Sequence, residues 1–206
     1  ISPRLTLGVN LYYMLYHNQL VATGMVNDGD DALNVNVDKS YRRGVEVMAT
    51  WKTAKWLTLS GNVTLSQNRI RDYVDELRDS PTYGQNLGDM TISYSPSVMG
   101  ALMADFHIKG FGLIWNTQYV GKQYFTNNEI EALSLDAYCV TNLDLGYTHK
   151  LRGGGSVRFG VAVNNLFSTL YESNGYGYSY MWDGERYDEA FFFPQAPINV
   201  LANVAV

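Results

Sequence analysis

The chain has 206 residues, of which 17% are charged and 14% aromatic, and its formal net charge at pH 7 is −5. The charged fraction is below the roughly 25% of a typical soluble domain, and the negative charge argues against a protein that binds nucleic acid through its phosphates. A single cysteine, Cys139, excludes an internal disulfide framework and a zinc site built from several cysteines. The sequence also lacks a run of about 18 apolar residues, which a membrane-spanning helix would need.

The dominant pattern is a strict alternation of apolar and polar residues, the period of a β-strand with two different faces. It is clearest in residues 57–66, where Leu and Val occupy one phase and Ser, Thr and Asn the other. We expect about eight strands, most of them long enough to cross a bilayer at roughly 9–11 residues each. In chain order they are residues 5–15, 45–51, 57–66, 101–108, 111–119, 139–148, 156–164 and 198–206.

The connections between these strands alternate between short and long. The short turns are residues 52–55, 109–110 and 150–154, and the long connections are residues 18–40, 69–97, 123–136 and 168–197. An antiparallel meander places all the long connections at one end, an asymmetry typical of transmembrane β-barrels, whereas such long loops are uncommon in compact soluble domains. The predicted fold is therefore all-β, an antiparallel transmembrane β-barrel meander of about eight strands.

The polar phase of the strands is rich in Asn, Thr, Ser, Gln, Gly and Tyr, rather than in the Lys and Glu that cover a soluble barrel. The few charges within strands, Glu46, Asp105, Asp144 and Arg158, all fall on this polar phase. An Arg or Lys facing lipid at mid-bilayer costs roughly 2–4 kcal/mol, and Asp or Glu somewhat less. We therefore interpret the polar phase as the lumen and the apolar phase as the lipid-facing surface.

Aromatic residues gather near both ends of the expected strands. Those near the short turns are Trp51, Trp56, Phe111 and Tyr147, and those near the long connections are Tyr13, Tyr16, Tyr94, Tyr119, Tyr124 and Tyr138. We interpret them as two girdles at the membrane interfaces, where a ring with a polar tip is favoured. The alternative is that they pack within the core of a β-sandwich.

Several short motifs occur in a fixed order along these strands. They are Tyr-Arg-Arg-Gly-Val-Glu at 41–46, Ser-Tyr-Ser-Pro at 93–96, Tyr-Val-Gly-Lys-Gln-Tyr at 119–124, Asn-Asn-Leu-Phe at 164–167, Tyr-Glu-Ser at 171–173 and Phe-Pro-Gln-Ala-Pro at 193–197. Each motif is weak alone, but their order and strand context together resemble the C-terminal barrel of TonB-dependent outer-membrane receptors. The resemblance extends over essentially the whole chain.

This resemblance implies that residues 1–206 are the C-terminal segment of a receptor β-barrel of about 22 strands, the size of such transporters, without the plug domain and the TonB-contacting segment. The chain would then lie in the Gram-negative outer membrane and take part in TonB-energised uptake of a scarce nutrient complex of the siderophore, haem or corrinoid class. The implied partners are outer-membrane lipid, the protein's own plug domain and remaining barrel strands, the TonB complex through the missing plug, and a small nutrient ligand. No nucleic acid, cofactor or enzymatic activity is expected. The family normally ends in an aromatic residue, so we expect Ile1 and Val206 to be boundaries within a longer protein.

Recognition residues are sought in the long connections, above all between Thr169 and Phe193, where aromatic residues alternate with Gly, Ser and Asp. Rigid rings among pliable residues give contact area at low entropic cost. We therefore propose as ligand-binding residues Tyr176, Tyr178, Tyr180, Trp182 and Tyr187. The alternative, that these rings pack on neighbouring loops or lie at the outer interface, stays open.

No catalytic arrangement is recognisable. The histidines His17, His107 and His149 lack the spacing of metal ligands. Residues Asn27 to Asp31 concentrate oxygen ligands, but without the full spacing of a calcium loop, so a solvated acidic loop is favoured over a Ca²⁺ site. The competing functions are a free-standing small outer-membrane barrel with a structural or adhesive role, and an outer-membrane enzyme of the protease or lipase kind.

Overall fold

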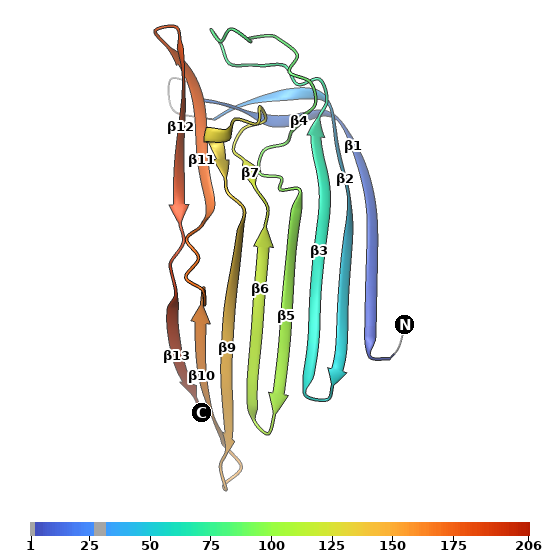
Figure 1. The fold of residues 1–206 in the computed structure, drawn as a ribbon, viewed down its shortest axis with the longest axis vertical. Coiled ribbons are helices and arrows are strands. Elements are labelled where there is room, and N and C mark those ends of the chain that lie inside the picture. Colours follow the sequence, from blue (N-terminus) through green and yellow to red (C-terminus); the bar gives the residue numbers. More distant parts are fainter. Residues whose placement is uncertain (1–2, 27–31) are drawn as a thin grey trace.

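The computed structural model describes residues 3–26 and 32–206, and most of them belong to antiparallel β-strands (Figure 1). Eight long strands pair in chain order within one sheet, which confirms the expected antiparallel meander. They are β1 (Leu5–Val26), β2 (Ala32–Ala54), β3 (Leu57–Ile70), β5 (Val98–Ile108), β6 (Phe111–Val120), β9 (Tyr138–Lys150), β10 (Ser156–Asn164) and β13 (Asn199–Ala205).

The remaining elements lie within the long connections between these strands. They are β4 (Met90–Thr91), β7 (Gln123–Tyr124), the 3₁₀ turn η1 (Glu131–Leu133), β8 (Ser134–Leu135) and the hairpin of β11 (Glu172–Trp182) and β12 (Glu185–Pro194). In the part of the chain that the structure describes, no helix is long and apolar enough to span a membrane.

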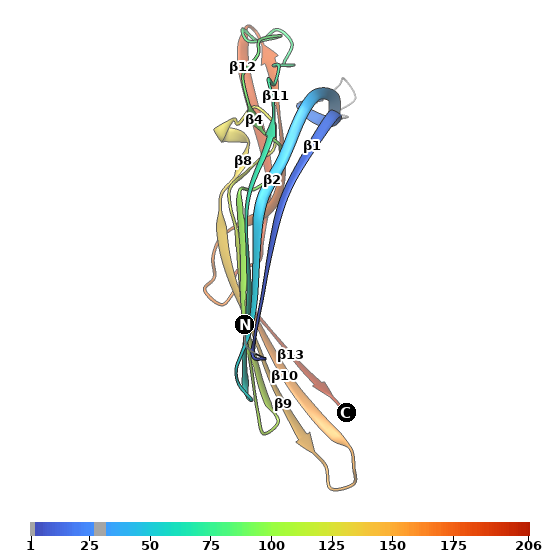
Figure 2. The same ribbon diagram turned by 90° about the vertical axis from the view of Figure 1, so that its right-hand side faces the viewer.

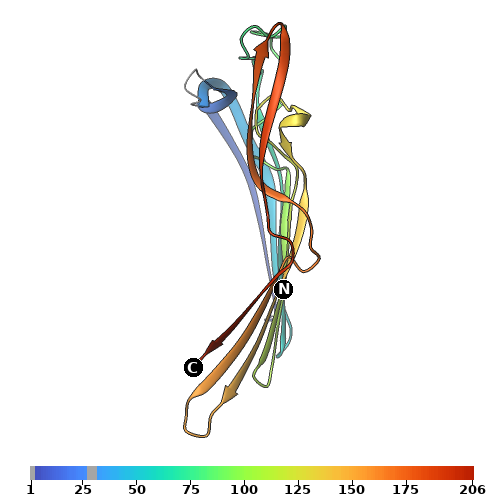
Figure 3. The same ribbon diagram turned by 90° about the vertical axis from the view of Figure 1, so that its left-hand side faces the viewer.

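The sheet is a single curved layer, as the two side views show (Figure 2 and Figure 3). Its edge strands β1 and β13 each pair with one neighbour and not with each other among the described residues. The segment is therefore an open piece of wall, and its two edges leave backbone donors and acceptors that need further strands. This arrangement is that of a part of a larger barrel.

The short turns all lie at one end of the sheet and the long connections at the other (Figure 1). Between β5 and β6 the chain reverses at Lys109 and Gly110, whose φ angles are 46° and 86°. Two consecutive residues with positive φ are typical of the two-residue hairpin turn whose twist matches the flanking strands.

The strand register places the polar phases of all eight strands on one face of the sheet. Residues directly opposite each other in an antiparallel pair share a face. Glu46 lies opposite Asn10 and Thr64, and the Asn10 Nδ2 donates to the Glu46 carboxylate at 3.0 Å. The other charged residues of the strands lie on the same face as Glu46. Their opposite residues connect them to it across the sheet, in the pairs Thr58–Asp105, Asp105–Ile114, Ile114–Asp144 and Thr148–Arg158.

The polar face is the hollowed one, with grooves lined by residues such as Thr6, Glu46 and Asn116. The opposite face carries Leu, Val and aromatic side chains, and on β1 they include the exposed Leu11, with 73% of its surface accessible. The expected division of the strands into a polar and an apolar face is thus confirmed.

Two expectations about the loop end were wrong. Residues 18–40 are not a long loop, because β1 runs on to Val26 and β2 begins at Ala32. Two members of the expected outer girdle also belong elsewhere. The Tyr16 hydroxyl donates to the Met14 sulfur at 3.2 Å on the polar face, and the Tyr94 hydroxyl donates to the Gly175 carbonyl at 3.1 Å.

Most of the buried apolar side chains in the described residues form two clusters at the loop end. One cluster joins the far ends of β1 and β2 to the segment after β3, through Val21, Val37, Ile70, Tyr73 and Ile92. The second cluster joins the connection between β6 and β9 to the β11–β12 hairpin and contains Phe125, Leu133 and Leu135. Both clusters hold the long connections in fixed positions above the wall.

Candidate functional site

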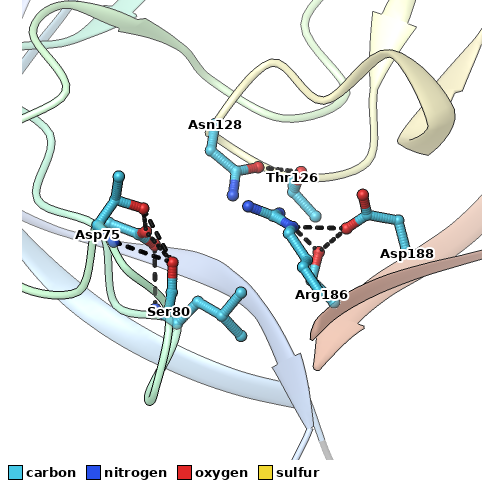
Figure 4. Close-up of polar contacts among 9 residues, drawn as sticks. Asp75, Ser80, Thr126, Asn128, Arg186 and Asp188 are labelled. Carbon is cyan, nitrogen blue, oxygen red and sulfur yellow. Dashed lines mark hydrogen bonds and ion pairs between the residues drawn. The ribbon is translucent and has the colours of Figure 1, made fainter. Parts of the chain in front are cut away.

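The connection that follows β3 is braced by a buried carboxylate (Figure 4). Asp75 accepts hydrogen bonds from the Leu77 amide at 3.1 Å, from the Ser80 hydroxyl at 3.3 Å and from the Thr82 hydroxyl. Nearby Tyr73 is buried, and this burial, reinforced by Asp75 and Glu76, raises the pKa of Tyr73 to about 12. The connection after β3 is therefore held in one conformation by its own hydrogen bonds and buried side chains.

The connection between β6 and β9 is tied to elements on both sides. Asn127 accepts from the Ser93 amide at 2.8 Å and donates to the Ala22 carbonyl on β1. Glu129 forms an ion pair with Arg69 at 2.6 Å and accepts from the Thr91 amide at 2.9 Å. These bonds fix residues 121–137 relative to β1, β3 and β4.

The last long connection, residues 168–197, contains a regular hairpin, whereas the sequence was interpreted as a long loop. Strands β11 and β12 pair from Trp182 opposite Glu185 down to Asn174 opposite Phe193. The chain reverses at Asp183 and Gly184, with φ angles of 50° and 77°. Asp-Gly is a strong hairpin signal because both residues tolerate positive φ.

One face of this hairpin packs on residues 121–137. Gly175 and Gly177 lie on it, and a Cβ added to Gly177 would come within 2.8 Å of Leu133 Cδ2 and 3.0 Å of Phe125 Cδ2. Phe192, opposite Gly175, packs on Phe125 with ring centroids 5.7 Å apart. Further from this contact the same face carries an Arg186–Asp188 ion pair at 2.9 Å (Figure 4). The glycines are therefore required by the close approach of the hairpin to this connection.

The other face of the hairpin, which we call the aromatic face, carries all five residues proposed from the sequence. Residues at every second position of β11 and their opposite residues on β12 share this face: Tyr176 with Phe191, Tyr178 with Glu189, Tyr180 with Tyr187, and Trp182 with Glu185. The Tyr176 and Phe191 rings stack with centroids 4.9 Å apart, and the Tyr180 and Tyr187 rings at 5.5 Å. Trp182 lies at the tip with 70% of its surface exposed.

A single carboxylate organises the middle of the aromatic face. The Tyr178 hydroxyl donates to one oxygen of Glu189 at 3.0 Å and the Tyr180 hydroxyl donates to the other at 2.8 Å. The hydrogen bond to Glu189 raises the pKa of the Tyr180 hydroxyl above its ordinary value. Both rings are thereby held in position before any ligand arrives.

Sequence reasoning missed three contributors to this face, Glu189, Phe191 and Phe193. Phe191 stacks on Tyr176, and Phe193 lies 6.2 Å from it between ring centroids. The available signals were the Asp-Gly turn and the period of two from Tyr187 to Phe193. The rings proposed as ligand contacts pack on one another across the hairpin, on the face opposite the one that contacts residues 121–137.

Metal-binding groups do not gather at this site. In the described residues no three His, Cys, Asp or Glu side chains lie close enough together to hold a metal ion. The suggested calcium loop, residues 27–31, lies outside the described residues. Cys139 is exposed and lies opposite Tyr119 on the apolar face of the wall.

Comparison with known proteins shows which family this chain belongs to. Residues 2–166 match the family described as TonB dependent receptor-like, beta-barrel. The chain belongs to this family. The family consists of receptors and transporters rather than enzymes, and its barrels are outer-membrane proteins of Gram-negative bacteria.

Solved structures with the same fold cover nearly the whole chain. The closed form of the ferric-catecholate import receptor Fiu from E. coli K12 has a TM-score of 0.65 at 18% identity, and covers 99% of this chain and 25% of its own. The ferric yersiniabactin uptake receptor FyuA from Yersinia pestis has a TM-score of 0.67 at 19% identity, with 99% and 28% covered. The copper transporter OprC has a TM-score of 0.66 at 12% identity, with 99% and 29% covered. The chain thus spans between a quarter and a third of the length of these structures.

Proposed function

We propose that this chain is the C-terminal part of the barrel wall of a TonB-dependent outer-membrane receptor, and that its aromatic face contacts the captured nutrient complex. Capture takes place at the loop end, and release inward follows displacement of a plug domain energised by TonB. The proposed cargo is a metal-bearing complex of the siderophore, haem or corrinoid class. The three similar structures, whose names refer to ferric-catecholate, ferric yersiniabactin and copper, favour a metal-bearing cargo.

The observation that carries this proposal is the row of rings that runs along one exposed face of the hairpin at the loop end. Tyr176, Tyr187, Phe191 and Trp182 remain between 41% and 70% exposed although they pack on one another. Rigid aromatic groups give large contact area with little loss of conformational freedom on binding. An aromatic surface of this kind complements a flat or amphipathic complex better than a small hydrated ion.

The open edges of the sheet support the assignment to a larger barrel. The outer strands β1 and β13 carry unpaired backbone groups, which in a membrane each cost several kcal/mol unless another strand pairs with them. Further barrel strands would remove this cost by closing the wall. A free-standing barrel of these eight strands would instead require β1 to pair with β13.

The proposal is tested by equilibrium binding with the full-length receptor in detergent, with a ferric-catecholate complex, haem and cyanocobalamin as probes. Combining Tyr176→Ala with Tyr180→Ala should raise the Kd for the probe that binds by about tenfold or more, equivalent to about 1.4 kcal/mol. The matched control is Tyr83→Ala, since Tyr83 is an exposed tyrosine that belongs to the connection after β3 and not to the hairpin.

Two outcomes would contradict the proposal. If none of the three probes binds, the cargo class is wrong. If the double variant and Tyr83→Ala bind equally well, the aromatic face is not the contact surface. Heat-modifiable gel mobility of each variant shows that the barrel is folded when binding is measured.

A further inference from the structure

The outward surface of the first three strands, together with Arg71 directly after β3, carries a basic and aromatic cluster that the proposed receptor function does not use. It consists of Tyr13, Tyr41, Arg43 and Arg71, together with Gln67. Arg43 Cζ lies 5.4 Å from the centroid of the Tyr41 ring, and Arg71 Cζ lies 5.3 Å from the same centroid. Tyr13 stacks on Tyr41 with centroids 6.3 Å apart and an interplanar angle of 22°.

The register places this cluster on the apolar face of the wall. Arg43 lies opposite Tyr13 on β1 and opposite Gln67 on β3, and its Nε donates to the Gln67 side-chain oxygen at 2.8 Å. Towards the short turns, the next rows of this face are wholly apolar. The first of these rows is Leu11, Val45 and Leu65, and the second is Val9, Val47 and Val63.

The cluster lies one membrane thickness from the aromatic residue at the other end of the same strand. From Trp51 to Tyr41 is a step of ten residues, or about 33 Å along a strand, which is about 25 Å of height at a tilt near 40°. The apolar band of an outer-membrane barrel is about 25 Å tall. With Trp51 at one interface, Tyr41 and its arginines therefore lie at the level of the lipid headgroups on the loop side.

The two guanidinium groups gather over a single ring, and neither forms an ion pair with a carboxylate of the described residues. Within residues 3–26 and 32–206, no carboxylate lies within 4.0 Å of the charged nitrogens of Arg43 or Arg71, whereas the neighbouring Arg69 is paired with Glu129. Tyr41 is only 7% exposed although it lies on the outward face, because these side chains cover it. Like charges held this close favour an anion that both can contact.

From this arrangement we propose that Tyr13, Tyr41, Arg43 and Arg71 form a binding site for the phosphate group of a membrane lipid in the outer leaflet. The planar guanidinium fork matches phosphate oxygens in pairs, and the Tyr41 ring holds both forks in place through cation–π contacts. The apolar rows beneath the cluster would receive the acyl chains of the same lipid. The inference depends on the membrane placement proposed above, but not on the identity of the cargo.

The site is tested with the full-length receptor reconstituted in phosphatidylcholine bilayers that contain a small fixed fraction of a diphosphorylated glycolipid or of its dephosphorylated counterpart. Retention of the glycolipid is measured by native mass spectrometry, and barrel unfolding by heat-modifiable gel mobility. The phosphorylated lipid should be retained and should raise the unfolding temperature of the wild type. Combining Arg43→Gln with Arg71→Gln should weaken retention about thirtyfold, equivalent to about 2 kcal/mol, since each basic residue near a membrane surface contributes about 1 kcal/mol.

Controls separate the possible explanations. Arg78→Gln removes an exposed arginine from the connection after β3 and should leave retention unchanged. Inorganic phosphate added to the dephosphorylated sample should not reproduce the thermal shift, because the proposed occupant is a lipid rather than free phosphate. If it does reproduce the shift, the lipid assignment is wrong.

The contradicting result is equal retention of both glycolipids, or equal retention of the phosphorylated lipid by the wild type and the double variant. Either would overturn the phosphate site while leaving the receptor function in place. Failure of the wild type to insert in any of these bilayers would overturn both this inference and the proposed membrane placement.

Discussion

The wall and the loop end of this segment are stabilised in different ways. In the wall, both faces of the sheet are open, and the strands are held by their backbone ladder and by whatever medium covers the apolar face. At the loop end, side chains such as Ile70, Tyr73 and Leu133 are almost completely buried. The wall therefore depends on its surroundings, whereas the loop end has small cores of its own and resembles a soluble domain.

The largest expected effect is on the wall. Val161→Arg places a charge on the apolar face of β10, opposite Leu145 and Ala202, and should abolish stable insertion, because an arginine facing lipid costs about 2–4 kcal/mol near mid-bilayer. Arg158→Gln on the polar face of the same strand should be tolerated. Equal loss of heat-modifiable gel mobility in the two variants would show that the faces are wrongly assigned.

A smaller effect is expected from emptying the core at the loop end. Phe125→Ala removes a buried ring that contacts Tyr94 and Phe192, at a cost of about 3 kcal/mol for a well-packed phenylalanine. The hairpin should then be cleaved faster by protease in the inserted receptor, while the barrel itself stays resistant. The control Phe111→Ala, in the wall, should leave hairpin cleavage unchanged; faster cleavage in both variants would mean that the two regions are not independent.

The contact between hairpin and connection can also be disturbed by adding volume. Gly177→Val forces a Cβ towards Leu133 and the Glu189 carbonyl, and overpacking of this kind costs about 1–3 kcal/mol. We expect the hairpin to shift and the Kd of the cargo to rise several-fold without loss of assembly. The same change at Gly153, which has open space around its Cβ position, is the control, and unchanged affinity in Gly177→Val would exclude the docked orientation as a requirement for binding.

The smallest effect appears only at high pH. The pKa of Tyr73 is raised from 10.0 to about 12, so the neutral hydroxyl stabilises the connection after β3 fully below pH 10, and this contribution is lost as the pH rises from 10 towards 12. Tyr73→Phe keeps the ring and should remove that pH dependence. Tyrosinate absorbance is measured against pH in both proteins, and the difference between the two curves is the titration of Tyr73. We expect this difference to be centred near pH 12, and a step centred near pH 10 would contradict the burial of Tyr73.

The sequence was informative about the wall because each strand must separate two media. The period of two in residues 57–66 or 156–164 is a direct consequence, and charges such as Arg158 mark the polar phase. The same period is present in residues 33–38, where Asn34, Asn36 and Asp38 occupy the polar phase, although these residues were expected to belong to a long connection. What a local pattern does not show is the contact with a distant segment, such as the bond from the Asn127 amide to the Ala22 carbonyl of β1.

The hairpin illustrates an intermediate case. All five proposed aromatic residues share one face, but the segment was interpreted as a long loop in which rigid rings lie among pliable Gly and Ser residues. Gly175 and Gly177 lack a side chain where Phe125 and Leu133 pack against the hairpin, so their role is to allow close packing rather than flexibility. Such long-range contacts are not visible in a local pattern.

The central claim, that hydrocarbon covers the apolar face of the wall, is tested most directly by nitroxide scanning along β10. In full-length receptor with Cys139→Ser, single labels at residues 158 to 163 would be reconstituted and their accessibility to oxygen and to a water-soluble relaxant compared. The account predicts an alternation in which Phe159, Val161 and Val163 are accessible to oxygen, and Arg158, Gly160 and Ala162 to the aqueous reagent. Equal access of the aqueous reagent to both sets of positions would contradict it.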